Sequence, residues 1–216
     1  MDELLAKKVL KEIKEVLDAK GVEFWLNFGS LLGAVREGKF ISYDNDIELN
    51  AWSHKVNETM MIDICRELCR RGFNAYYSTL TDYIIMEKET IPVAFSMFTQ
   101  EGEKAVRPHE YVYGQGIQMF VAKCFYYISE AFARTRVGKL NMETISGLRR
   151  LIIFLAVTVT SILPNKLRRK IAILFRLISN KVIRSKSRFG KTRFPARFYL
   201  KLRNFEFYGM IFKVPA

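Results

Sequence analysis

Three acidic side chains alternate between Tyr43 and Leu49, at Asp44, Asp46 and Glu48. If this stretch is a β-strand, successive side chains point to opposite faces, and the three carboxylates share one face. Neighbouring carboxylates repel one another unless a cation lies between them. Magnesium prefers hard oxygen ligands and shares them with phosphates, and manganese is the alternative ion. The spacing therefore predicts a magnesium site formed by these three acids.

A phosphate-binding turn is expected shortly before the acids. Gly29 and Ser30 interrupt a strand expected over Val22–Phe28, and a glycine there lets the backbone approach a ligand closely. A short helix that begins at Leu31 would direct its unpaired amide groups at a phosphate. Arg36 adds a guanidinium group that can hold a phosphate in a bidentate way. Phosphate donors and metal ligands together indicate a nucleotide or phosphodiester site.

Each of these features is weak alone, whereas their order along the chain is specific. The stretch from Gly29 to Leu49 reads GSLLGAVREGKFISYDNDIEL. It resembles the LicD family, which includes the fukutin-related proteins, with the family pattern GTLLGxxR followed by IPWDDDxD. The close match covers about Phe24–Leu49, and the end of the chain, FEFYGMIFKVPA, looks like a later strand of the family that ends in Pro-Ala.

The resemblance implies a nucleotidyltransferase-like fold and a phosphotransfer activity. Family members move a phospho-alcohol group, such as phosphocholine or a phospho-polyol, from a CDP-linked donor onto a sugar of a cell-surface glycan. On this model Asp44 and Asp46 hold the magnesium ion and are the catalytic residues. The resemblance assigns the donor contacts to Gly29, Ser30, Gly33 and Arg36.

The sequence departs from the family pattern at three places. Asn45 replaces the middle acid, although strand alternation turns its side chain away from its neighbours, and Glu48 replaces an aspartate. Nucleotidyltransferase-like folds usually add a carboxylate from a later strand, but the strand expected over Ile91–Phe98 carries Ser96 and no acid. Glu87, on the preceding strand, is a substitute whose position is more typical of a solvent-facing acid.

The positive charge is concentrated in the last third of the chain. The protein has 35 lysines and arginines against 22 acids, a net charge of +13. Between Arg134 and Arg203 lie 19 basic residues and a single acid, Glu143, so this segment carries +18. Such an asymmetry indicates an anionic partner: a membrane surface, a phosphorylated polymer or a nucleic acid. Few aromatic side chains accompany the basic residues, which argues against specific nucleic-acid binding.

Two segments of this basic region bear on membrane association. Leu151–Leu163 is uncharged and shorter than the roughly 20 residues that a spanning helix needs. Lys166–Ile183 repeats apolar residues on one side among many basic ones, a pattern that suits the lipid headgroup boundary. The segment from Arg149 to Arg188 is therefore expected to bind anionic lipid. A buried core helix followed by an ordinary surface helix is the equal alternative.

Helices and strands are expected to mix without strict alternation, which favours an α+β domain: a nucleotidyltransferase-like mixed sheet flanked by helices, with a helical basic C-terminal extension. A strand is expected over Phe40–Leu49. Ile117–Ala133 is expected to begin as a strand and to continue as a helix. Residues 1–133 would form the catalytic core, 134–203 the basic helical segment, and 204–216 a terminal hairpin that returns to the core.

Composition and motifs leave two classes of function. Three cysteines and two histidines exclude a disulfide framework and a Cys/His zinc module. The acidic first residues lack the pattern of a secretory signal, so a cytoplasmic location, peripheral at the inner face of a membrane, is expected. We expect a magnesium-dependent phosphotransferase that uses a CDP-alcohol donor and a glycan or lipid-linked sugar acceptor. The alternatives are a nucleotidyltransferase, or a non-catalytic membrane-peripheral or polyanion-binding module with the same fold.

Overall fold

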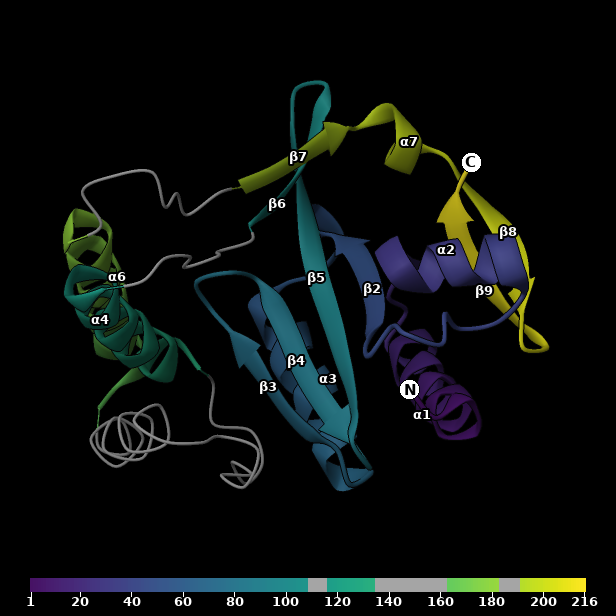
Figure 1. Ribbon diagram of the computed structural model, residues 1–216, viewed down its shortest axis with the longest axis horizontal. Coiled ribbons are helices and arrows are strands. Elements are labelled where there is room, and N and C mark those ends of the chain that lie inside the picture. The colour runs from purple at the N-terminus through teal and green to yellow at the C-terminus, as the bar shows by residue number, and fades with distance from the viewer. Residues whose placement is uncertain (109–115, 135–162, 183–190) are drawn as a thin grey trace.

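A mixed β-sheet runs through the centre of the protein (Figure 1). The computed structural model describes residues 1–108, 116–134, 163–182 and 191–216. Within these residues the sheet has nine strands in the order β3-β4-β5-β2-β1-β9-β8, with β6 joined to β5 and β7 joined to β6. The strands are β1 (Phe24–Leu26), β2 (Ile47–Trp52), β3 (Asn74–Ser78), β4 (Tyr83–Lys88), β5 (Ile91–Glu101), β6 (Lys104–Pro108), β7 (Lys191–Pro195), β8 (Leu202–Phe207) and β9 (Met210–Pro215).

Two amphipathic helices form the main core with one face of this sheet. α1 (Glu3–Ala19) begins after Asp2, whose side chain accepts a hydrogen bond from the Leu5 amide at 3.0 Å. α3 (Glu58–Arg70) follows the short 3-10 helix η1 (Ser53–Lys55). Their apolar sides pack on alternate residues of the central strands because side chains in a strand point to each face in turn. On β2 these inward residues are Ile47, Leu49 and Ala51.

A pair of helices lies beside the β3 edge of the sheet. α4 (Ile117–Ala133) and α6 (Asn165–Val182) run side by side in Figure 1 and are joined by a buried ion pair between Arg176 and Glu130. The Ser129 hydroxyl also donates to the Ala172 carbonyl oxygen at 2.8 Å. The Thr79 amide, just after β3, donates to the Ala133 carbonyl oxygen at 3.2 Å and attaches the pair to the sheet.

The α+β architecture and several expected elements are confirmed. The expected N-terminal helix is α1, the amphipathic basic helix is α6, and the hairpin of β8 and β9 turns at Tyr208 and Gly209, both with positive φ. β9 lies parallel to β1, which attaches the last residues to the central sheet. No helix among the described residues is long and apolar enough to span a membrane.

Other expectations are wrong. Ile117–Ala133 is a helix throughout, because its apolar residues pack on α6 rather than on a strand. The residues from 134 to 203 are not only helical: β7 pairs with β6, and the short helix α7 (Arg197–Leu200) inserts Tyr199 beside Trp25 and Phe98. The strand expected over Phe40–Leu49 begins only at Ile47. Of the apolar run Leu151–Leu163, residues 151–162 lie outside the described residues.

Candidate active site

Asp44 and Asp46 lie in a loop that leads into β2, and Glu48 is the second residue of that strand. The Asp44 amide donates to the Ile41 carbonyl oxygen at 3.0 Å, and the Asp44 carboxylate accepts from the Asn45 amide at 3.0 Å. This turn leaves Asn45 exposed, while Asp44 and Asp46 are half-buried and close enough that the charge of Asp44 raises the pKa of Asp46. The expected shared environment of these two acids therefore exists, but a turn rather than strand alternation produces it.

The glycine before the acids lies directly against Asp44. α2 (Phe28–Glu37) begins at Phe28, earlier than the expected start at Leu31, so Gly29 and Ser30 are in its first turn. A Cβ atom at Gly29 would lie 1.9 Å from Asp44 Oδ2. The Gly29 amide donates to Glu48 Oε2 at 3.2 Å. Gly29 thus brings the helix start, the acidic loop and β2 together.

Ser30 and Gly33 hold this arrangement from the buried side of α2. Ser30 is 1% exposed, and its hydroxyl accepts a hydrogen bond from the Glu48 amide at 2.9 Å. A Cβ atom at Gly33 would lie 2.6 Å from the Lys39 carbonyl oxygen and 3.1 Å from the Ile41 amide nitrogen. Both residues therefore have a positioning role in the structure, and direct donor contacts by either remain predictions.

Arg36 lies at the opposite end of α2 from Gly29 and is exposed. Its guanidinium group forms an ion pair with Glu37 and a hydrogen bond with the side chain of Tyr43, one residue before Asp44. Both interactions raise the pKa of Arg36, which stays charged in any case. Arg36 therefore borders the acidic loop from its outer side.

Sequence reasoning missed Arg107, the cation beside these acids. It lies on β6, and its Nη1 atom is 3.6 Å from Glu48 Oε1, with both side chains mostly buried. The same guanidinium group lies over the Phe28 ring, 5.0 Å from its centroid. The pairing of β6 with β5 brings Arg107 to this position. The residues around Arg107 in the sequence form no motif that could have indicated this contact.

Burial and the charge of a neighbouring acid raise the pKa values of Asp46 and Glu48. The pKa of Asp46 is raised, first by burial and then by the charge of Asp44. The pKa of Glu48 is also raised by burial and by Asp46, while the Gly29 amide and Arg107 act in the opposite direction. The Gly29 amide and Arg107 therefore stabilise the negative charge of Glu48, whereas Asp46 lies beside the like charge of Asp44.

The donor set fits a magnesium ion held by two protein carboxylates. Among the described residues, no three acidic, histidine or cysteine side chains are arranged as a ready metal cluster. Glu48 already accepts a hydrogen bond from the Gly29 amide and lies near Arg107, so Asp44 and Asp46 are the two acids that could hold a magnesium ion. Magnesium is commonly bound by one or two carboxylates together with substrate phosphates, so this pair is chemically sufficient. The wider three-acid ligand set remains a prediction.

No acid from the neighbouring strand β5 joins the site. β5 lies parallel to β2, with Ser96 opposite Asn50. The Asn50 amide group donates to the Ser96 carbonyl oxygen at 2.9 Å and its oxygen accepts from Asn27 at 2.8 Å, so buried amides occupy this position. Glu87 lies on β4, on the far side of β5, and pairs with Pro92.

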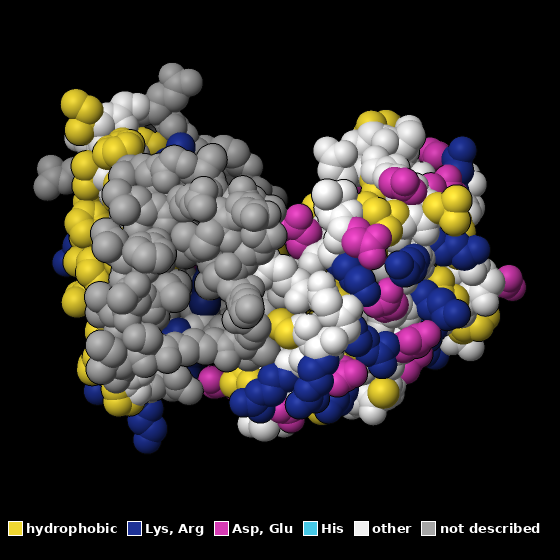
Figure 2. Space-filling model, turned by 90° about the horizontal axis from the view of Figure 1, so that it is seen from below, with side chains coloured by type: hydrophobic (Ala, Val, Ile, Leu, Met, Phe, Trp, Pro, Cys, Tyr) yellow, Lys and Arg dark blue, Asp and Glu magenta, His cyan; other side chains and the backbone are white. Residues whose placement is uncertain are grey.

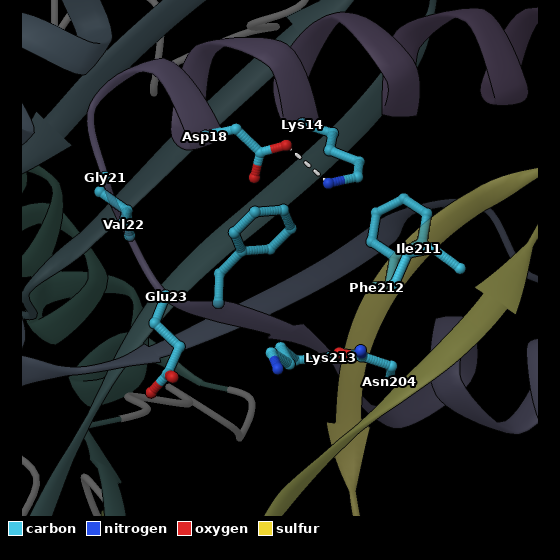
Figure 3. A pocket seen from close by; sticks show the side chains of 10 residues that line it. Lys14, Asp18, Gly21, Val22, Glu23, Asn204, Ile211, Phe212 and Lys213 are labelled. Atoms are coloured by element: carbon cyan, nitrogen blue, oxygen red, sulfur yellow. Dashed lines mark hydrogen bonds and ion pairs between the residues drawn. The ribbon is translucent and has the colours of Figure 1, made fainter.

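A separate surface pocket of about 340 Å³ lies between the end of α1 and β9 (Figure 3). Lys14 points into it and pairs with Asp18 at 2.6 Å. The Lys14 ammonium group also lies over the rings of Phe24 and Phe212, at 5.9 and 5.4 Å. Because this lysine is already satisfied by neighbours and none of the predicted site residues lines the pocket, we place the candidate active site at the acidic loop.

A helix whose first turn holds a glycine pressed against an acidic loop, on a mixed sheet, agrees with a nucleotidyltransferase-type domain. The model of the family described as LicD/FKTN/FKRP, nucleotidyltransferase domain, matches residues 21–131. This match spans just over half of the chain, and the protein belongs to the LicD/FKTN/FKRP family.

Similarity to individual curated proteins is confined to a short segment. Ribitol 5-phosphate transferase FKRP of Homo sapiens and of Mus musculus is 40% identical to this chain over 50 residues. That segment covers 23% of this chain and 10% of either relative.

Two solved structures of ANT(2'')-Ia are also similar. The solution structure of this antibiotic-resistance factor has 13% identity over 83% of this chain and 93% of that one, with a TM-score of 0.38. The crystal structure with adenylyl-2"-tobramycin has 15% identity over 79% and 97%, with a TM-score of 0.34. TM-scores this low carry no argument about the site.

Proposed function

We propose that the protein is a magnesium-dependent phosphotransferase that moves a phospho-alcohol group from a CDP-linked donor onto a sugar of a cell-surface glycan. The observation that supports this most directly is the contact between Gly29 and Asp44, because it places a half-buried acid at the start of a helix. Family membership and the short similarity to a ribitol 5-phosphate transferase support the same class of chemistry.

In this proposal the acceptor oxygen attacks the phosphorus that carries the alcohol. A new phosphorus–oxygen bond forms, the diphosphate bridge of the donor breaks, CMP leaves, and the hydroxyl proton passes to solvent. Asp44 and Asp46 would hold magnesium, which neutralises charge on the donor phosphates. Arg107 and the Gly29 amide keep Glu48 in place behind them, and Arg36 supplies positive charge at the outer side of the loop. Positioning and electrostatics supply most of the rate enhancement in such reactions.

We further propose that the enzyme works at the surface of an anionic membrane on the cytoplasmic side, where a lipid-linked or nascent glycan is available. α6 has no acidic residue, and its exposed side mixes apolar with basic side chains. Figure 2 shows hydrophobic side chains along the outer edge of the α4 and α6 pair. The exposed apolar residues of α6 are Leu167, Ile173, Leu174 and Leu177. Mixed faces of this kind suit the headgroup boundary.

The decisive experiment measures thermal stabilisation and CMP release with magnesium and a panel of CDP-choline, CDP-ribitol and CTP. We expect stabilisation by a CDP-alcohol only when magnesium is present. Asp44→Asn and Asp46→Asn should each remove it without unfolding the protein. Glu206→Gln, which changes an exposed acid on β8, is the matched control.

The outcomes separate the candidate activities. Release of CMP from a CDP-alcohol supports phosphotransfer, whereas release of diphosphate from CTP would identify a nucleotidyltransferase. A folded protein that binds every donor equally well with and without magnesium, and equally well as Asp44→Asn, would overturn the proposal. That result would favour a binding module, consistent with Ser96 at the position where a later acid is expected.

A further inference from the structure

A second basic cavity lies where the end of α4 meets the beginning of α6. Its volume is about 250 Å³, and Thr79 after β3 and Glu58 at the start of α3 border it. Four cationic residues contribute to its lining: Arg134, Lys166, Arg168 and Arg169. With Glu58 as the acid of the lining, the cavity carries a net charge of about +3.

Arg134 is the unusual member of this cavity because its charge is buried and no carboxylate among the described residues forms an ion pair with it. It is 5% exposed, and its guanidinium group donates to the Tyr76 hydroxyl at 3.1 Å and stacks on the Tyr76 ring at 4.0 Å. Its Nε atom is buried and has no hydrogen-bond partner among the described residues. A buried, uncompensated charge is strongly unfavourable, so an anion in the cavity would stabilise it.

The surroundings of Arg134 favour the same kind of ligand. Arg168 is buried and donates to the Arg134 carbonyl oxygen, which fixes the start of α6 against the end of α4. Lys166 and Arg169 lie in the first turn or two of α6, are exposed, and make no ion pair with a described carboxylate. The positive end of the α6 dipole adds to their field.

We infer that this cavity binds the phosphate group of a phosphate ester, separately from the candidate active site. Guanidinium groups match the geometry of phosphate oxygens, and the volume leaves room for part of the attached alcohol. Thr79 and Glu58 in the cavity lining follow the end of β3 and the 3-10 helix η1, and η1 comes directly after the last residue of β2. Asp44 and Asp46 instead precede the first residue of β2, so the two sites lie toward opposite ends of that strand. The phosphate comes either from a soluble phosphate ester or from a lipid headgroup, which present the same chemistry.

The test is calorimetric titration of the full chain, in EDTA, with inorganic phosphate and with glycerol 3-phosphate. Wild-type protein should bind both and be stabilised by them. The double variant Lys166→Gln/Arg169→Gln changes only exposed side chains and should bind at least about tenfold more weakly, because two phosphate contacts are removed. The control is Lys181→Gln, which removes one positive charge from an exposed residue at the other end of α6 and should bind phosphate like wild type.

Asp44→Asn should keep phosphate binding in EDTA, which separates failure of this inference from failure of the proposed function. The inference is overturned if the double variant binds like wild type, if wild type shows no binding, or if Asp44→Asn abolishes binding. Vesicles identify the source of the phosphate. A preference for phosphatidic acid over phosphatidylglycerol that the double variant loses assigns the cavity to a lipid headgroup. Binding of glycerol 3-phosphate without such a preference assigns it to a soluble ester.

Discussion

Gly29 and Asp44 lie so close together that not even a methyl group fits between them: a Cβ atom at Gly29 would be 1.9 Å from Asp44 Oδ2. Gly29 has ordinary helical geometry rather than a positive φ, so its backbone does not require glycine. The requirement comes from the acid instead. The helix start and the acidic loop can therefore approach one another only with glycine at this position.

Gly29→Ala should separate activity from stability. Alanine is more favourable than glycine inside a helix by about 0.5–1 kcal/mol, and the Asp44 carboxylate is the end of a side chain that can rotate away. We therefore expect the free energy of unfolding to change by less than about 1 kcal/mol. Displacing the acid should lower activity by about 100-fold, since small misplacements have large effects on catalysis. Urea unfolding and initial rates measure the two quantities.

In an Asp44→Ala background, Gly29→Ala should no longer disturb the loop, and the unfolding free energy should rise. A fully active Gly29→Ala enzyme would contradict the placement of Asp44 in the active site.

Gly33→Ala should behave differently although it lies one turn further along α2. Its Cβ atom would meet the Lys39 carbonyl oxygen at 2.6 Å and the Ile41 amide nitrogen at 3.1 Å, and backbone atoms cannot rotate away. Overpacking of this kind destabilises proteins by about 1–3 kcal/mol. We expect losses of both stability and activity, measured by the same two assays. Unchanged stability would show that residues 39–41 can move, which would weaken the proposed positioning role.

Asp46→Asn should stabilise the metal-free protein near neutral pH. The folded state raises the pKa of Asp46, so ionisation opposes folding. This opposition is absent below the ordinary pKa of an aspartate, grows as pH rises from there through the raised pKa, and is complete above it. Unfolding in EDTA should therefore show the variant more stable than wild type at pH 7 and equal to it well below the ordinary pKa. Glu206→Gln should show no such gain, and a less stable Asp46→Asn at pH 7 would contradict the repulsion.

Arg107→Gln should destabilise the site by leaving Glu48 without its counter-charge. The two groups are 3.6 Å apart and mostly buried, so an unpaired carboxylate there should lower stability by about 1–3 kcal/mol at neutral pH. The loss should shrink in acid, where Glu48 is protonated. Arg107→Lys should recover part of the stability, and Arg203→Gln on the exposed side of β8 is the control. Equal losses at all pH values would assign Arg107 to packing on Phe28 alone.

Binding to anionic vesicles should depend on the exposed side of α6. Each basic residue near such a surface contributes about 1 kcal/mol, so a few of them suffice for reversible attachment that added salt weakens. Leu174→Gln/Leu177→Gln should reduce sedimentation with vesicles that contain phosphatidylserine, because it removes two exposed apolar side chains. Ile211→Gln is the control, because Ile211 on β9 is similar in size and exposure to these leucines, and its replacement should not reduce sedimentation. A folded wild-type protein that ignores these vesicles at low salt would refute membrane attachment.

Local order along the chain was enough to predict the class of domain and to bring Asp44 and Asp46 to notice as neighbouring acids. The succession of a glycine, a short helix and alternating acids lies within Gly29–Glu48, so a motif of neighbours could carry it. The 3.6-residue period of α1 and α6 is equally local, and both helices were expected from it. The pairing of Asp44 with Asp46 was also predicted, although a turn rather than a strand produces it.

Contacts between distant parts of the chain were decided by tertiary structure alone. Arg107 reaches Glu48 only because β6 folds back on β5, a pairing to which no spacing in the sequence points. Ile117–Ala133 is apolar enough for either a strand or a helix, and packing against α6 selects the helix. The burial of Arg134 likewise depends on where that helix pair meets β3. Sequence periodicity records which residues can be buried, but burial energy depends on the partner surface, and only the complete fold supplies that partner.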